Sequence, residues 1–290
     1  MFSRKALQKL DSRGRSFNAY LAYVGDSGRE SVDTIKARKS LAGSLFRFSA
    51  GVLALVLLVL LPLFITGEAR TWLSLCSVTL FWSAVIVGWL LLHLGLIRDP
   101  SGVPVSLKLA NKLTILRFLL IPPVLFLLAH ERFAAAAALY AIGAITDVAD
   151  GFVARKRHEI TAFGVVMDPL ADILSTAGVF AVLLAQGLVP NWVFLLLIGR
   201  YGSLFLGTVI MFFKYGPLEF KATLTGKIVG VLQALAVIMI VVYTVLGGDV
   251  RSALGRYVYP VLGLLFGAVI VSQLVLGLRK IKSGTVQIGS

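Results

Sequence analysis

The sequence predicts an all-α integral membrane protein with about eight transmembrane helices. Of its 290 residues, 58% are hydrophobic and 14% are charged, and a soluble domain of this length could not bury so much apolar surface. The apolar residues also fall in runs of about 20, the length at which an α-helix crosses a bilayer. The predicted spans are residues 48–66, 72–97, 113–129, 133–153, 164–186, 191–213, 228–246 and 256–278.

The distribution of basic residues predicts the orientation of these spans. The net charge of +14 favours contacts with anionic lipid headgroups over nucleic acid, because it accompanies long apolar runs. Lys and Arg gather before the first span and after every second one, as they do on the cytoplasmic side of membrane proteins. We therefore expect both termini to face the cytoplasm, together with any site at the inner ends of the spans, and the membrane to be the inner membrane if the cell is bacterial. The opposite turns hold only Arg70, Arg132, Arg251 and Arg256.

Helix-breaking residues divide the chain between the second and third spans. Pro100, Gly102 and Pro104 interrupt the sequence there, and the alternation of apolar and basic residues over 106–112 suits a short helix in the membrane interface. The lone Cys76 excludes an intrachain disulfide framework and a cysteine-based zinc site. The expected parts are a basic cytoplasmic tail (1–45), two accessory transmembrane helices (46–98), a linker with an interfacial helix (99–112), a six-helix catalytic membrane domain (113–282) and a cytoplasmic C-terminal tail (283–290).

Four aspartates stand at the ends of predicted spans. Asp147 and Asp150 lie at the inner end of the fourth span, and Asp168 and Asp172 lie in the first turns of the fifth. Spacings of three and four residues place each pair on one helix face, and the short turn between the spans brings the faces together. Carboxylates at membrane depth are costly unless a cation compensates them, so the cluster predicts a functional site.

The chemistry of these four aspartates favours divalent cations. Oxygen-only ligation suits Mg²⁺ or Mn²⁺ rather than Zn²⁺. Two such ions are a recurring device for phosphoryl and nucleotidyl transfer, which indicates a diphosphate substrate. Gly151 leaves room for a ligand beside the helix, and Arg155 could clamp a phosphate. Each also has a simpler interpretation, as a helix-packing contact and an interface anchor respectively.

The string from Asp147 to Arg155, followed by Gly164, Asp168 and Asp172, resembles the signature of the CDP-alcohol phosphatidyltransferases. The resemblance covers roughly residues 106–282 and implies a six-helix core. It further implies a homodimeric enzyme that transfers a phosphatidyl group from CDP-diacylglycerol to a small alcohol and releases CMP. The first two spans lie outside the resemblance.

The resemblance also assigns roles to individual residues. Asp147, Asp150 and Asp168 would bind the ions, and Asp172 would act as general base, as metal ligand or as both. Residues implied to contact CDP-diacylglycerol are Gly151, Arg155 and Thr161, together with Asn111, Thr114 and Arg117, whose helix is similar to the first core helix of the family. An alternative interpretation of that last trio is that Asn111 and Thr114 cap the helix while Arg117 reaches the interface.

The acceptor alcohol is less sharply indicated. Pro169, directly after the third motif aspartate, resembles the phosphatidylglycerophosphate synthase and cardiolipin synthase branches of the family. Directly after the fourth aspartate those branches usually carry Lys, and this chain differs from them by having Ile173. Glycerol 3-phosphate is the leading acceptor; the alternatives are phosphatidylglycerol, inositol phosphate and serine. If the acceptor carries a phosphate, the cations expected to hold it are Arg200, Lys221 and Lys227, although both lysines also fit as markers of the cytoplasmic side.

Two other classes of function compete with this interpretation. Buried acids in a helical membrane protein also occur in cation transporters, but transporter sites tend to lie at the bilayer midplane within internal repeats. The acids here sit at helix ends, and no second copy is visible. A non-catalytic membrane scaffold is the other alternative, and the complete set of four aspartates argues against it.

Overall fold

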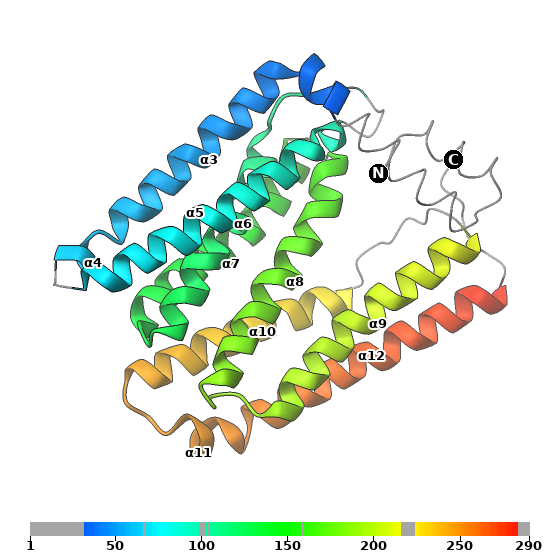
Figure 1. Ribbon diagram of the computed structural model, residues 1–290. Coiled ribbons are helices and arrows are strands. Elements are labelled where there is room, and N and C mark those ends of the chain that lie inside the picture. Colours follow the sequence, from blue (N-terminus) through cyan, green and yellow to red (C-terminus); the bar gives the residue numbers. More distant parts are fainter. Residues whose placement is uncertain are drawn as a thin grey trace. The chain divides into compact units, whose positions relative to one another are not determined.

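The computed structural model describes residues 32–65, 68–98, 103, 105–157, 159, 161–215 and 224–283, and their regular elements are helices (Figure 1). The predicted all-α class is therefore confirmed. The helices are α3 (Lys39–Val59), α4 (Pro62–Ile65), α5 (Ala69–Leu92), the short 3₁₀ helix η1 (Leu94–Leu96), α6 (Leu109–Ala129), α7 (Phe133–Lys156), α8 (Ala162–Ala185), α9 (Asn191–Tyr215), α10 (Leu224–Val245), α11 (Val250–Gly255) and α12 (Val258–Ser283).

Seven helices in the described part of the chain are long and apolar enough to cross a membrane, which makes this an integral membrane protein. They correspond to seven of the eight predicted spans. The remaining prediction, 191–213, falls on α9, whose apolar stretch is described over the shorter segment Asn191–Gly207.

The helix boundaries differ from the expected ones at two places. Residues 105–108 are not helical and α6 begins at Leu109, so residues 109–112 of the expected interfacial helix form the first turn of α6. Helix α3 begins at Lys39, within the range expected for the tail.

The chain forms two compact units. The first contains the described residues of Met1–Phe126 and Leu139–Ser175, and the second those of Leu127–Ala138 and Thr176–Ser290. The four motif aspartates, Asp147, Asp150, Asp168 and Asp172, all belong to the first unit, whereas Arg200 belongs to the second.

In the first unit, α3 and α5 lie side by side (Figure 1). These two accessory helices are attached to the segment that leads into α6. The guanidinium of Arg38, just before α3, donates to the carbonyl oxygens of Leu94 (3.3 Å), Ile97 (3.1 Å) and Val105. One fork of donors thus joins the start of α3, the end of the α5–η1 segment and the approach to α6.

In the second unit, α9 and α12 run side by side (Figure 1). Gly263 of α12 permits this close packing, since a Cβ at this position would lie only 2.5 Å from the indole ring of Trp192. Phe180 and Phe266 pack edge to face in the interior of the same unit. This unit carries the network around Arg200 described below.

Candidate functional site

The site is built where the end of α7 and the beginning of α8 meet α6, within the first unit. Asp147 and Asp150 lie in the last turns of α7, and Asp168 and Asp172 lie in the first turns of α8. Their exposure differs: Asp150 is only 4% exposed, whereas half of the Asp147 side chain is accessible. The aspartates brought together by their spacing therefore occupy unequal environments.

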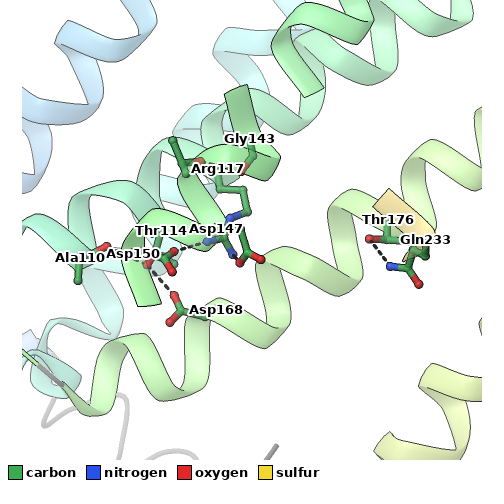
Figure 2. A network of polar contacts seen from close by, with 10 residues as sticks. Ala110, Thr114, Arg117, Gly143, Asp147, Asp150, Asp168, Thr176 and Gln233 are labelled. Atoms are coloured by element: carbon green, nitrogen blue, oxygen red, sulfur yellow. Dashed lines mark hydrogen bonds and ion pairs between the residues drawn. The ribbon is translucent and has the colours of Figure 1, made fainter. Parts of the chain in front are cut away.

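Arg117 of α6 binds both aspartates of α7. Its Nη1 lies 2.8 Å from Asp147 Oδ1, and its Nη2 donates to Asp150 Oδ2. Figure 2 shows these three side chains turned toward one another. Arg117 is itself only 4% exposed, so the interpretation that it reaches out to the membrane interface is wrong. It serves instead as a buried counter-charge.

Two further hydrogen bonds connect α6 with α8. Thr114 Oγ1 lies one turn before Arg117 and donates to Asp168 Oδ1 (2.6 Å), as seen in Figure 2. Thr161 Oγ1, just before α8, donates to Asn111 Oδ1 (2.8 Å) and accepts from the backbone N–H of Gly164 (3.2 Å). The three polar residues expected from α6 thus all face the site, and Asn111 and Thr114 do more than cap a helix.

Gly164 leaves a small space beside these groups. A Cβ built on it would lie 3.4 Å from Asp168 Oδ2, 3.7 Å from Thr161 Oγ1 and 3.9 Å from Asn111 Oδ1. These are ordinary van der Waals distances, so a methyl group would fit without a clash. It would, however, cover one side of the Asp168 carboxylate.

Two buried donors at this site have neither a hydrogen-bond partner nor an ion-pair partner within the described part of the chain. They are Nε of Arg117 and Nδ2 of Asn111; Nη1 of Arg117 also forms no hydrogen bond but is ion-paired with Asp147. A buried donor without a partner is costly, so such groups in a native structure call for a ligand, water or ion. Both donors would be satisfied by an oxygen-rich anionic ligand.

The donor set fits a hard divalent cation, because Asp147, Asp150 and Asp168 offer carboxylate oxygens around Arg117 and Thr114 of α6. Among the described residues, no three His, Cys, Asp or Glu side chains are close enough to enclose an ion, and the positive charge beside Asp147 and Asp150 is that of Arg117. An incoming ion would therefore compete with Arg117 for Asp147 and Asp150.

Arg200 lies in the second unit and is 7% exposed, as expected for a charged residue in the middle of a span. Its Nη1 donates to Gln233 Oε1 (2.6 Å), and the guanidinium lies over the rings of Tyr201 and Phe266. Gln233 Nε2 in turn donates to Tyr201 Oη and to Thr176 Oγ1, both at 3.1 Å. Among the described residues, the partners of the Arg200 guanidinium are all neutral.

Three predicted site residues lie outside the described residues, either entirely or in their side chains. Lys221 lies outside the described residues. Arg155 and Lys227 lie in α7 and α10, where the backbone is described but their side chains are not. Gly151 continues α7 directly after Asp150 and is partly exposed.

Sequence reasoning missed the partners of Arg200. Gln233 and Thr176 are polar residues inside apolar spans, and both are buried. Polar side chains at membrane depth are themselves a signal, because they must find partners there. That signal does not say which helices pair, so the link between Gln233 and Arg200 needed the tertiary structure.

Comparison with known proteins gives a family match over most of the membrane-spanning part. The model of the family described as CDP-alcohol phosphatidyltransferase matches residues 107–275. This range contains the four motif aspartates and excludes α3 and α5. The family is generally dependent on a divalent metal.

Curated relatives share part of this range. Proteins named CDP-diacylglycerol–glycerol-3-phosphate 3-phosphatidyltransferase are 37% identical in Rickettsia typhi (32% of this chain, 54% of that protein), 42% in Pseudomonas fluorescens (28% and 42%) and 32% in Bacillus subtilis (32% and 56%). The chain thus spans about half the length of the curated relatives it matches. No solved structure matches it.

Proposed function

The chain belongs to the CDP-alcohol phosphatidyltransferase family, and from this premise we propose that it transfers a phosphatidyl group from CDP-diacylglycerol to a small alcohol and releases CMP. The observation that carries the proposal is the convergence of the family's aspartates, on α7 and α8, with buried polar side chains of α6. The two buried donors without partners, on Arg117 and Asn111, support binding of an anionic ligand at this place.

The proposed reaction is a substitution at the β-phosphorus of the diphosphate. The acceptor hydroxyl oxygen forms a bond to that phosphorus, the bond from the phosphorus to the bridging oxygen breaks, and CMP leaves with the bonding electrons. Asp172 takes the proton of the hydroxyl, which makes it the general base. Gly151, Arg155 and Thr161 hold the CDP portion, together with Asn111, Thr114 and Arg117.

A metal site completes this proposal. Asp147, Asp150 and Asp168 would hold Mg²⁺ or Mn²⁺, with Asp172 as a further possible ligand, and we propose two ions. Bound there, the ions would neutralise charge that develops on the diphosphate oxygens. Arg117, released from Asp147 and Asp150, would then be available to the same diphosphate.

Glycerol 3-phosphate is the acceptor that we propose. The names of the relatives support it, since each specifies that compound for the protein concerned. Arg200 supports an acceptor that carries a phosphate, because a buried cation with neutral partners is best compensated by an anion. Lys221 and Lys227 are proposed as further phosphate ligands.

The proposed orientation follows from the positive-inside pattern, with both termini and the four aspartates facing the cytoplasm. A homodimer is proposed from the family. Crosslinking in native membranes would test the dimer. Labelling of single cysteines, introduced near each end of the chain after replacing Cys76, would test the orientation.

The central experiment measures CMP release from CDP-diacylglycerol by the purified chain with Mg²⁺. Glycerol 3-phosphate, phosphatidylglycerol, serine and inositol phosphate are supplied in parallel. We expect release with glycerol 3-phosphate. Release with another of the four would keep the reaction and correct the acceptor, and silence with all four in folded protein would refute the proposed transfer to these alcohols.

A further inference from the structure

Helix α6 contains two consecutive prolines five and six residues beyond Arg117. Pro122 and Pro123 have no backbone N–H, so the carbonyl oxygens four residues earlier, on Phe118 and Leu119, lose their usual helical donor. In a membrane such carbonyls need another partner, which neighbouring helices often provide. The carbonyl oxygens of Phe118 and Leu119, directly after Arg117, therefore need a hydrogen-bond donor from elsewhere.

A side chain of accessory helix α5 supplies a donor to one of these two carbonyl oxygens. Trp82 Nε1 donates to the carbonyl oxygen of Phe118 at 3.1 Å. Seven residues later on the same helix face, the Trp89 ring packs edge to face on the fully buried Phe118 ring, with 6.1 Å between the centroids. Helix α5 thus contacts both the backbone and the side chain of Phe118, the residue after Arg117.

Helix α6, which α5 contacts in this way, carries the polar side chains Asn111, Thr114 and Arg117 of the site. Among the described helices that can cross a membrane, α6 is the most buried. In its most apolar 18-residue segment 67% is buried, against 17–33% in the corresponding segments of the other six. Its rotation and depth determine where Thr114 meets Asp168 and where Arg117 meets Asp147 and Asp150. Yet α5 lies outside residues 107–275, the range that the family model matches.

We propose that Trp82 is a positioning residue of the site. Its indole N–H binds the Phe118 carbonyl that Pro122 leaves without a backbone donor, and so holds the part of α6 that presents Thr114 and Arg117. This gives the accessory helices a role in the chemistry of the core. The inference rests on the proposed function, because it takes the aspartates that α6 contacts to be the metal ligands.

The test uses the chemistry of the missing donor. Trp82→Phe keeps an aromatic ring but removes the N–H, whereas Pro122→Ala restores a backbone N–H that can reach the same carbonyl. Mn²⁺ binding to the purified full-length chain is measured from the electron paramagnetic resonance signal of free Mn²⁺. Trp89→Phe is the matched control, because it removes an indole from the same helix face but keeps a ring against Phe118.

We expect Trp82→Phe to weaken Mn²⁺ binding about fivefold or more, with Pro122→Ala and Trp89→Phe within about twofold of the parent. Adding Trp82→Phe to Pro122→Ala should change the affinity by less than about twofold. A lower unfolding temperature without any change in Mn²⁺ affinity would overturn the inference, since Trp82 would then serve packing alone. The same holds if Pro122→Ala fails to rescue.

A folding failure and a loss of activity are distinguished from loss of the positioning role. If Trp82→Phe alone does not fold, recovery of folding and Mn²⁺ binding in the double variant supports the inference, and failure of both variants overturns it. CMP release is assayed in the same preparations. An intact Mn²⁺ pattern without any CMP release would reject the proposed function and leave the positioning role standing, whereas a parent chain that binds no Mn²⁺ would reject both.

Discussion

Arg117 is the counter-charge of the two aspartates at the end of α7. It and Asp150 are each only 4% exposed, so each would be an uncompensated buried charge without the other. Removing one partner of a buried ion pair costs about 3–5 kcal/mol. The contact with Asp147 adds less, because half of that side chain is exposed to solvent screening.

We therefore expect Arg117→Gln to lower the unfolding temperature strongly in EDTA and much less in millimolar Mg²⁺, where an ion replaces the lost charge. Thermal unfolding in detergent measures both conditions. Arg256→Gln, at an exposed position between α11 and α12, serves as control and should show no such dependence. Equal losses with and without Mg²⁺ would mean that the ion and Arg117 do not compete for the same aspartates.

Asp172 is the residue on which the proposed proton transfer depends. Asp172→Asn is nearly isosteric but cannot accept the proton, and general-base catalysis contributes about 10²–10⁴-fold. We expect CMP release to fall by about that factor, with the unfolding temperature nearly unchanged. Asp33→Asn, at an exposed position before α3, should keep full activity. Full activity in Asp172→Asn would remove this residue from the mechanism.

Gly164 tests whether the space beside Asp168 is used by substrate. The Cβ of Gly164→Ala would lie 3.4 Å from Asp168 Oδ2, so the variant should fold normally. We expect about a tenfold lower kcat/KM, equivalent to about 1.4 kcal/mol of lost transition-state binding. Gly202→Ala, where a Cβ meets nothing within 4 Å, is the control. Unchanged kinetics in Gly164→Ala would show that nothing needs to approach on that side.

At the scale of the helices, a buried polar link joins α10 to α8 and α9. Gln233 accepts from Arg200 and donates to Thr176 and Tyr201. Gln233→Leu would leave the buried guanidinium without its acceptor, and a hydrogen bond to a charged group contributes about 1.5–3 kcal/mol. Helix α10 should therefore dock less firmly in this variant.

The expected result for Gln233→Leu is a clear loss of thermal stability and, if Arg200 holds the acceptor phosphate, a raised KM for glycerol 3-phosphate. Gln273→Leu is the matched control, since Gln273 accepts from the neutral hydroxyl of Ser203 and is partly exposed. Similar effects of the two substitutions on stability would show that the charge on Arg200 adds nothing to the link.

Helix boundaries illustrate how far sequence reasoning reaches at this scale. Hydrophobic length identified the core of nearly every span, because roughly 20 apolar residues are needed to cross the hydrocarbon. It placed the beginning of α6 too late, at 113 instead of Leu109, and inserted an interfacial helix before it. The length of an apolar run does not reveal a polar helical turn that extends the helix beyond the run. Such a turn is defined by its backbone hydrogen bonds and not by its hydropathy.

At the scale of the whole molecule, the pairing of Arg117 with the aspartates predicts how activity and helix content respond to removal of divalent ions. The proposed reaction needs divalent ions, whereas the fold has Arg117 as an internal counter-charge. EDTA should therefore abolish CMP release while leaving the helical circular dichroism unchanged, and Mg²⁺ or Mn²⁺ should restore activity. Helix content that collapses on chelation would contradict this, because the ion would then be structural.

The sequence by itself determined the class of the protein, the approximate spans and the positions of the four motif aspartates, and it predicted that these aspartates bind divalent cations. These follow from local properties: apolar length, charge, and the three- and four-residue spacings that place Asp147 with Asp150 and Asp168 with Asp172 on common helix faces. The family resemblance further predicted that Asn111, Thr114 and Arg117 contact CDP-diacylglycerol, which stays a prediction; the structure places all three beside the motif aspartates or Thr161.

Only the tertiary structure decided which groups compensate these residues. Arg117 pairs with Asp147 and Asp150 across 30 and 33 positions of sequence, Gln233 reaches Arg200, and Trp82 reaches the carbonyl freed by Pro122. A sequence shows that a buried charge or an unpaired carbonyl must find a partner, because leaving it alone in a membrane is too costly. Which partner it finds depends on how the helices rotate and pack, and that is a property of the folded chain.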